Sequence, residues 1–104
     1  MAKQNKYTKS ARGQDCQIRI PGVCNRDPAT TVPAHLNGAG MGIKHPDIFI
    51  AYSCSDCHDF VDGRNRPDAI MMHLGWSITD VKLAHHEAVT RTQQIMIKNK
   101  VLVL

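Results

Sequence analysis

Runs of alternating and apolar residues in the first half of the chain predict short β-strands. Residues 16–20 alternate between polar and apolar side chains, as a half-buried strand does. Residues 21–22, Pro-Gly, predict a turn that sends the chain back on itself. Residues 30–35 favour a strand, and Pro33 restricts that strand to an edge or to its end because proline donates no backbone hydrogen bond. The apolar run 48–52 predicts a buried strand or extended segment.

The second half of the chain carries helical signals. A short helix is expected over residues 56–63, which end in a glycine suited to a helix C-terminus. Residues 67–75 begin with Pro-Asp and end with glycine, which predicts a second helix. Residues 77–80 resemble a capping box, and apolar side chains then recur at helical spacing over residues 78–95. Residues 101–104 are either a small docking strand or a hydrophobic tail.

These elements together predict an α+β fold. We expect a single domain over residues 14–104, preceded by a basic, flexible tail over residues 1–13. A chain of 104 residues can bury one core but not two. With one tryptophan, two tyrosines and two phenylalanines, that core is poor in aromatic side chains, so a bound metal would add needed stability.

Four cysteines in two pairs, Cys16 with Cys24 and Cys54 with Cys57, suggest that metal. The Cys-x-x-Cys spacing of the second pair suits two corners of a tetrahedron, and four thiolates would close a structural zinc site without a position for water. No secretory signal is visible, so we expect a location in the cytoplasm of a bacterial cell, where paired cysteines more often bind metal than form disulfides. A pair of disulfides and two unrelated cysteine pairs remain as alternatives.

The charge distribution favours an anionic partner only slightly. The formal net charge is +4, and the first 14 residues contain four basic side chains and no acidic one: Lys3, Lys6, Lys9 and Arg12. Such a tail is often merely solvated, but it would also attract a polyphosphate such as nucleic acid. No stretch has the length of a membrane span, so we expect no membrane partner.

Three further residues add a second pattern to the cysteines. His35 stands at the end of a predicted strand, Asp47 precedes the apolar run, and His58 directly follows Cys-x-x-Cys. This order resembles the HNH, or ββα-metal, nuclease motif over about residues 14–66. The stretches ARG, CQIRIPGVC and CSDCHD, at residues 11–13, 16–24 and 54–59, also resemble a family of small phage and prophage proteins called "putative nucleases". A recombination-enhancing endonuclease of a temperate phage is a more distant likeness.

The resemblance implies a fold, an activity and residue roles. It implies a zinc-stapled ββα-metal core with C-terminal helices, and a metal-dependent DNA endonuclease used in phage recombination. His35 would be the general base that takes a proton from the attacking water, and imidazole suits this role because it titrates near neutral pH. His58 would bind Mg²⁺ or Mn²⁺, which stabilises the charge of the transition state, and Asp62 would be a second ligand. Asp47 would orient His35 or reach the metal.

The chain also departs from the motif. Many HNH proteins carry an aspartate directly before the base as a metal ligand, and here that position is Ala34. Asp47 lies two residues further from the cysteine than the usual asparagine. The ligand set is therefore incomplete unless Asp62 or Asp47 supplies the missing oxygen. The alternative function is a non-catalytic zinc-binding module that holds DNA or a recombination protein.

Other charged residues and histidines are interpreted with the motif in view. The candidates for contact with DNA phosphates are seven basic side chains: Lys3, Lys6, Lys9, Arg12, Lys44, Arg64 and Arg66. Each has the alternative of being an ordinary solvated charge, just as His58 has that of a substitute zinc ligand. No role in the site is expected for His45, His73, His85 and His86. The adjacent pair at 85 and 86 would point to different faces of a helix.

Overall fold

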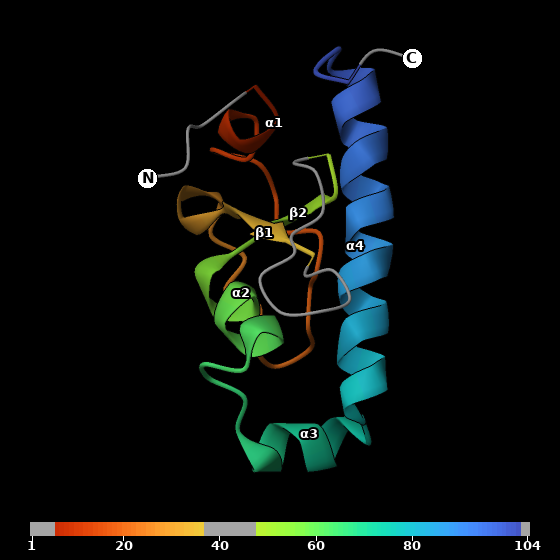
Figure 1. Ribbon diagram of the computed structural model, residues 1–104. Coiled ribbons are helices and arrows are strands. Elements are labelled where there is room, and N and C mark those ends of the chain that lie inside the picture. The colour runs from red at the N-terminus through yellow and green to blue at the C-terminus, as the bar shows by residue number, and fades with distance from the viewer. Residues whose placement is uncertain (1–5, 37–47, 103–104) are drawn as a thin grey trace.

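A computed structural model describes residues 6–36 and 48–102 of the chain. Helices lie around a two-stranded sheet in an α+β arrangement (Figure 1). The elements are, in chain order, α1 (Lys6–Lys9), the 3-10 helix η1 (Pro28–Thr30), β1 (Val32–His35), β2 (Ile50–Ser53), α2 (Ser55–Asp62), α3 (Asp68–Leu74) and α4 (Ile78–Lys98). The α+β class predicted from the sequence is confirmed.

Strands β1 and β2 pair in antiparallel fashion, with Val32 opposite Ser53 and His35 opposite Ile50. Both predicted strands are therefore confirmed, although each is shorter than its apolar run. Pro33 lies opposite Tyr52, whose backbone carbonyl accepts from Gln17 N–H at 2.7 Å and whose N–H donates to Thr92 Oγ1 of α4 at 3.0 Å, so neither group needs a partner on Pro33. The missing N–H of the proline consequently leaves no gap in the pairing of the two strands.

Helices α2 and α3 end where the sequence predicts, and each begins within one residue of its predicted start. Cys54 is the N-cap of α2, and Gly63 ends the helix in the left-handed conformation, with φ of 81°. Gly75, with φ of 69°, ends α3 in the same way. A backbone at positive φ favours glycine because other side chains are strained there. Both predicted helix ends are confirmed.

Helix α4 is the longest element, with 21 residues, and Figure 1 shows it as a rod along one side of the molecule, with α3 across its lower end. The predicted capping box is present: Ser77 N–H donates to Asp80 Oδ2 at 2.8 Å. The predicted stripe is buried from Val81 to Thr92, whereas Ile78, in the first turn, is 47% exposed. Its face packs against β2, and two polar members of the stripe, His85 and Thr92, each form a hydrogen bond across to the sheet.

The predicted strand over residues 16–20 is wrong. The segment has no regular secondary structure, and Arg19 adopts a positive φ of 54°. Its alternation is lost because Cys16, Gln17, Ile18 and Ile20 are all buried, and only Arg19 is exposed. The predicted turn after it is confirmed: the Ile20 carbonyl accepts from Val23 N–H at 3.0 Å and Cys24 N–H at 2.9 Å.

The first and last described segments meet on the sheet. Helix α1 lies within the basic segment that was expected to be a flexible tail, and Ala11 is 1% exposed. The Ser10 hydroxyl lies 2.6 Å from the Tyr52 hydroxyl of β2, and Val101 and Leu102 pack beside Met96 in the same cluster. Within residues 6–36 and 48–102, no helix is long and apolar enough to cross a membrane.

Candidate functional site

The four cysteines predicted to bind one metal ion lie together. Their sulfur atoms are all within 4.8 Å of one another, and Cys54 Sγ lies 3.9 Å from Cys24 Sγ. A tetrahedral zinc ion with Zn–S bonds of about 2.3 Å places its sulfurs about 3.8 Å apart. Cys54 and Cys57 come from the start of α2, and Cys16 and Cys24 flank the turn at residues 21–22. The cluster can therefore hold a metal ion such as zinc.

Backbone N–H groups are directed at the sulfurs. Cys57 N–H donates to Cys54 Sγ at 3.4 Å, and Arg19 N–H donates to Cys16 Sγ at 3.5 Å. The positive φ of Arg19 belongs to the tight turn around that sulfur. Hydrogen bonds of this kind orient the ligands of a metal and stabilise negative charge on them. The segment 16–20 is therefore irregular because its backbone turns around the Cys16 sulfur.

Electrostatics within the cluster favour a shared cation. A hydrogen bond from the Cys57 thiol lowers the pKa of Cys16 to about 4, and the same contact, with burial, raises the pKa of Cys57. Burial raises the pKa of Cys24 to about 11. One thiolate forms readily, whereas the next ones are opposed by burial and by the charge of their neighbours. A bound divalent cation removes that opposition, which is why thiolate sites release protons when they bind metal.

No disulfide links the four thiols, which rules against the disulfide alternative in this structure. The cluster is complete without a histidine, so His58 has no need to replace a cysteine. His58 follows Cys57 on α2, so its side chain leaves the helix about 100° away from that of Cys57. The second group of predicted residues lies on the face of α2 that carries His58.

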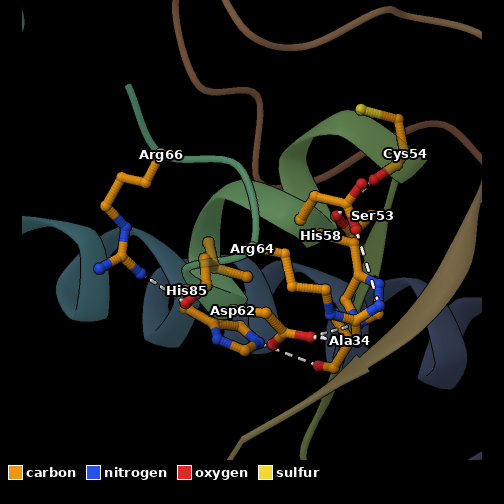
Figure 2. Close-up of polar contacts among 10 residues, drawn as sticks. Ala34, Ser53, Cys54, His58, Asp62, Arg64, Arg66 and His85 are labelled. Carbon is orange, nitrogen blue, oxygen red and sulfur yellow. Dashed lines mark hydrogen bonds and ion pairs between the residues drawn. The ribbon is translucent and has the colours of Figure 1, made fainter. Parts of the chain in front are cut away.

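The second group lies on α2 and just beyond it (Figure 2). His58 Nε2 is 3.4 Å from Asp62 Oδ2, and both side chains are 24% exposed. The predicted common face of these two residues, one helical turn apart, is confirmed. Arg64 Nη2 donates to the same Asp62 oxygen at 2.9 Å. A cation at His58 and Asp62 would therefore compete with Arg64 for this oxygen.

His35 is half-buried at the last position of β1, as predicted. The residue before it, Ala34, is fully buried in the core and offers no side-chain ligand. The Ala34 carbonyl instead accepts a hydrogen bond from His85 Nε2 of α4, at 2.9 Å. Helix α2 contacts both β1 and α4, so the strand end, His58 and His85 belong to one region of the fold. Asp47 lies outside the described residues.

His85 is the polar residue that sequence reasoning missed. It is 9% exposed, and Figure 2 shows its ring beside Ala34, on the side of α4 that faces α2. Burial lowers the pKa of His85, while the hydrogen bond to Ala34 and the charge of Asp62 act in the opposite direction. Its signal in the sequence was a histidine inside the apolar stripe of α4, for which no role in the site was expected.

The predicted phosphate contacts have different environments. Arg66 is tied to the C-terminal end of α2: its Nε donates to the Phe60 carbonyl at 2.9 Å and its Nη2 to the Val61 carbonyl at 2.8 Å. The Arg64 side chain is 66% exposed. Lys6, Lys9 and Arg12 are exposed on and after α1, whereas Lys3 and Lys44 lie outside the described residues. Arg66 thus has a structural task that Arg64 lacks.

The chain is similar to known proteins along most of its length. A family model described as "Putative nuclease YbcO" matches residues 5–101. The proteins of that name from Escherichia coli (strain K12) and Enterobacteria phage 82 are each 40% identical over 97 residues, which cover 90% of this chain and 93% of theirs. A solved structure described as a putative bacteriophage protein from Escherichia coli K-12 superposes with a TM-score of 0.71, at 37% identity, over 90% of this chain and 99% of the other.

Proposed function

The chain belongs to the YbcO family of putative nucleases, and from this premise we propose that it is a metal-dependent DNA endonuclease of the HNH type. The reaction would be hydrolysis of a phosphodiester bond. The predicted likeness to a family of small phage and prophage nucleases is thereby confirmed at the level of the family. The HNH type, the metal and the substrate are our proposal.

The single observation that carries the proposal is the order β1, β2, α2 with its polar residues. His35 ends β1, and α2 begins at the cysteine cluster and carries His58 and Asp62 on one face. This is the order that a ββα-metal core requires: a base on the strand and metal ligands on the helix. A structural zinc at the four cysteines would fix the start of α2 to the segment 16–24 and so hold that face in place.

In the proposed reaction His35 acts as the general base. Its imidazole would take a proton from the water that attacks the phosphorus, and the half-buried position leaves it open to solvent and substrate. His58 and Asp62 would hold one divalent cation, Mg²⁺ or Mn²⁺, which when bound stabilises negative charge on the phosphate and the leaving oxygen. A histidine ligand favours Mn²⁺ over Mg²⁺, because imidazole is softer than carboxylate oxygen. Asp47 remains a candidate for orienting His35.

Several basic residues would contact the phosphates of the DNA. Arg64 lies beside Asp62 and would meet the phosphate that is cut, once the cation takes its place at the carboxylate. Lys6, Lys9 and Arg12 lie on a different part of the molecule and would meet phosphates farther along the duplex. Because relatives come from a phage and from Escherichia coli, we propose that the activity serves recombination of phage or prophage DNA, in the bacterial cytoplasm.

One observation favours a second function, a non-catalytic zinc module that binds DNA or a recombination protein. Ala34 offers no ligand, and Asp62 Oδ2 is occupied by Arg64, so the described residues offer the catalytic cation only two side chains. In that case the cysteine cluster would remain essential, and the polar face would bind phosphates without cutting them.

Cleavage of supercoiled plasmid in the presence of Mg²⁺ or Mn²⁺ tests the choice between the two functions. We expect nicking or linearisation that a chelator stops. His58→Ala and Asp62→Asn should raise the half-saturating metal concentration by at least the roughly 10- to 100-fold that outer-shell changes produce. Asp59→Asn is the matched control, because Asp59 lies on α2 but pairs only loosely with Arg64, at 3.8 Å. A protein that binds plasmid but leaves it intact with either metal would favour the module.

A further inference from the structure

His85 joins the longest helix to the residue that precedes the proposed base. We propose that His85 is a positioning residue for His35: its imidazole holds the peptide unit from which the base begins. Because His35 receives its role from the function proposed above, the catalytic consequence of His85 depends on that function. The tether itself is a structural feature and can be tested without cleavage.

The contact is specific in its chemistry. His85 Nε2 lies 2.9 Å from the Ala34 carbonyl oxygen, and the two residues are 51 positions apart in the chain. A carbonyl oxygen only accepts hydrogen bonds, so Nε2 must carry the proton and donate it. Ala34 is fully buried and His85 is 9% exposed, so water cannot easily replace either partner. The buried Nε2–H of His85 would cost about 1–3 kcal/mol without an acceptor, which keeps the pair together.

The geometry transmits this contact to His35. The Ala34 carbonyl and the His35 N–H belong to the same planar peptide unit, so fixing one end of that plane fixes the other. On the far side of His35, the Leu36 N–H donates to the Phe49 carbonyl at 3.1 Å. The backbone is thus held by hydrogen bonds on both sides of His35. Of these two bonds, the one from His85 comes from α4, outside the sheet.

The anchor itself is rigid. His85 is in the middle of α4, between the buried residues Val81 and Ala88, which belong to the same core cluster as Ala34. An imidazole packed in this way has little freedom to rotate. The charges of Asp62 and His58 both act on His85, so the tether lies within electrostatic reach of the proposed metal ligands. His85 would therefore set the position of the strand end relative to α2.

Precision at this point matters for catalysis. A general base has to come within about 2.6–3.2 Å of the proton that it removes. A displacement of about 1 Å, even when caused by a residue away from the chemistry, can slow an enzyme by about 100-fold. We therefore expect loss of His85 to lower kcat by roughly 10- to 100-fold while leaving the KM for DNA unchanged. A packing role alone would lower the stability of the protein, but it would not lower kcat selectively while leaving KM unchanged.

Four variants test this role. His85→Ala removes the donor. His85→Gln keeps an amide N–H at about the reach of imidazole Nε2, and we expect it to restore kcat to within about threefold of the parent. His85→Asn carries the same amide one bond shorter and should stay slow. His86→Ala is the control, because His86 is exposed and its ring bonds to the Lys82 carbonyl of its own helix.

The kinetic outcomes separate the possible roles. A slow His85→Ala that His85→Gln rescues supports positioning, and if the alanine variant fails to fold, the comparison of glutamine with asparagine decides. Full activity of folded His85→Ala would overturn the proposal, as would glutamine and asparagine variants that are equally slow. A rise in the required metal concentration, with kcat restored at saturation, would also overturn it, because His85 would then be a metal ligand.

The NMR signals of the histidine rings give a reading that needs no cleavage. We expect His85 in the Nε2–H tautomer, His35 ring signals that shift in His85→Ala, and their return in His85→Gln. Unchanged His35 signals in His85→Ala would overturn the tether. A parent protein that does not cut DNA but shows these shifts would overturn the nuclease function and leave the tether standing.

Discussion

The cysteine cluster and the polar face on α2 start from the same helix but are built differently. The cluster is closed: four ligands of one kind lie within 4.8 Å of one another, three of them are buried, and backbone N–H groups point at two of the sulfurs. The polar face is open: His58 and Asp62 are each 24% exposed, and Asp62 is shared with Arg64. Under the proposed function, stability and chemistry would be separated on this small scaffold. A closed site suits a structural ion, whereas an open one leaves room for substrate and water.

The largest effect should come from breaking the closed site. Cys54→Ser should lose the single zinc ion that we expect per chain and, with it, cooperative folding, because metal binding contributes directly to folding in sites of this type. Metal analysis and thermal unfolding measure both. Ser55→Ala, at the exposed next position, should leave them unchanged. Freshly prepared parent protein that carries disulfides and no metal would end this interpretation.

The two arginines after α2 should differ in their effects on stability and on DNA binding. Arg66→Ala removes two partly buried hydrogen bonds to carbonyls at the end of α2, which should lower the free energy of unfolding by about 1–3 kcal/mol. Arg64→Ala removes only exposed ion pairs and should change it by about 0.5 kcal/mol or less. At equal folded fraction, however, Arg64→Ala should weaken DNA binding more. Equal losses of stability in urea titrations would contradict this division.

Acid should lower the free energy of unfolding through protonation of His85. Burial holds the folded-state pKa of His85 below its ordinary value, so the folded protein resists protonation. The stabilisation that neutral His85 contributes to the folded protein is therefore complete above the unfolded-state pKa of about 6.5. It is lost as the pH falls below that value. The free energy of unfolding of the parent should fall more than that of His85→Gln between pH 7.5 and 5.5. Zinc release in acid affects both proteins alike, so a pH-independent difference between them would refute the prediction.

The smallest effect should come from the basic residues near the N-terminus. Replacing Lys6, Lys9 and Arg12 by glutamine should lower the log–log salt slope of DNA binding by up to about 2.7, at about 0.9 per phosphate contact. Substitution is preferable to deletion because Ala11 and Ser10 pack against the sheet. Binding between 50 and 200 mM salt provides the measurement, and cleavage at low salt should persist. An unchanged slope would show that these charges do not meet DNA.

Local signals predicted much of the fold. Glycines at 63 and 75 and the capping box at 77–80 mark helix ends by their own backbone chemistry, and no distant contact changes them. The strand predicted over residues 16–20 was wrong because its pattern was local, whereas its conformation is set by a distant partner. The Cys16 sulfur must meet Cys54 and Cys57, and the backbone turns at Arg19 to let it do so.

The parts of the site that lie close together in the sequence could be predicted, and the contacts between distant residues could not. The spacing of Cys54, Cys57 and His58 predicts their positions because they share one helix start. The contact of His85 with Ala34 could not be predicted, since 51 residues separate them and only the packing of α4 on the sheet brings them together. The contacts of Arg66 with the end of α2 could not be predicted for a related reason: an arginine that bonds to a helix end looks, in the sequence, like any other basic residue.

The most direct measurement is plasmid cleavage by His35→Ala, made alongside its zinc content and thermal unfolding. His35 is half-buried at the end of a strand and lies outside the cysteine cluster, so the variant should fold and carry zinc as the parent does. We expect cleavage with Mg²⁺ or Mn²⁺ to fall by a factor of about 100 or more, which is the range that general bases contribute. A folded, zinc-loaded His35→Ala that cuts DNA as fast as the parent would contradict the HNH assignment.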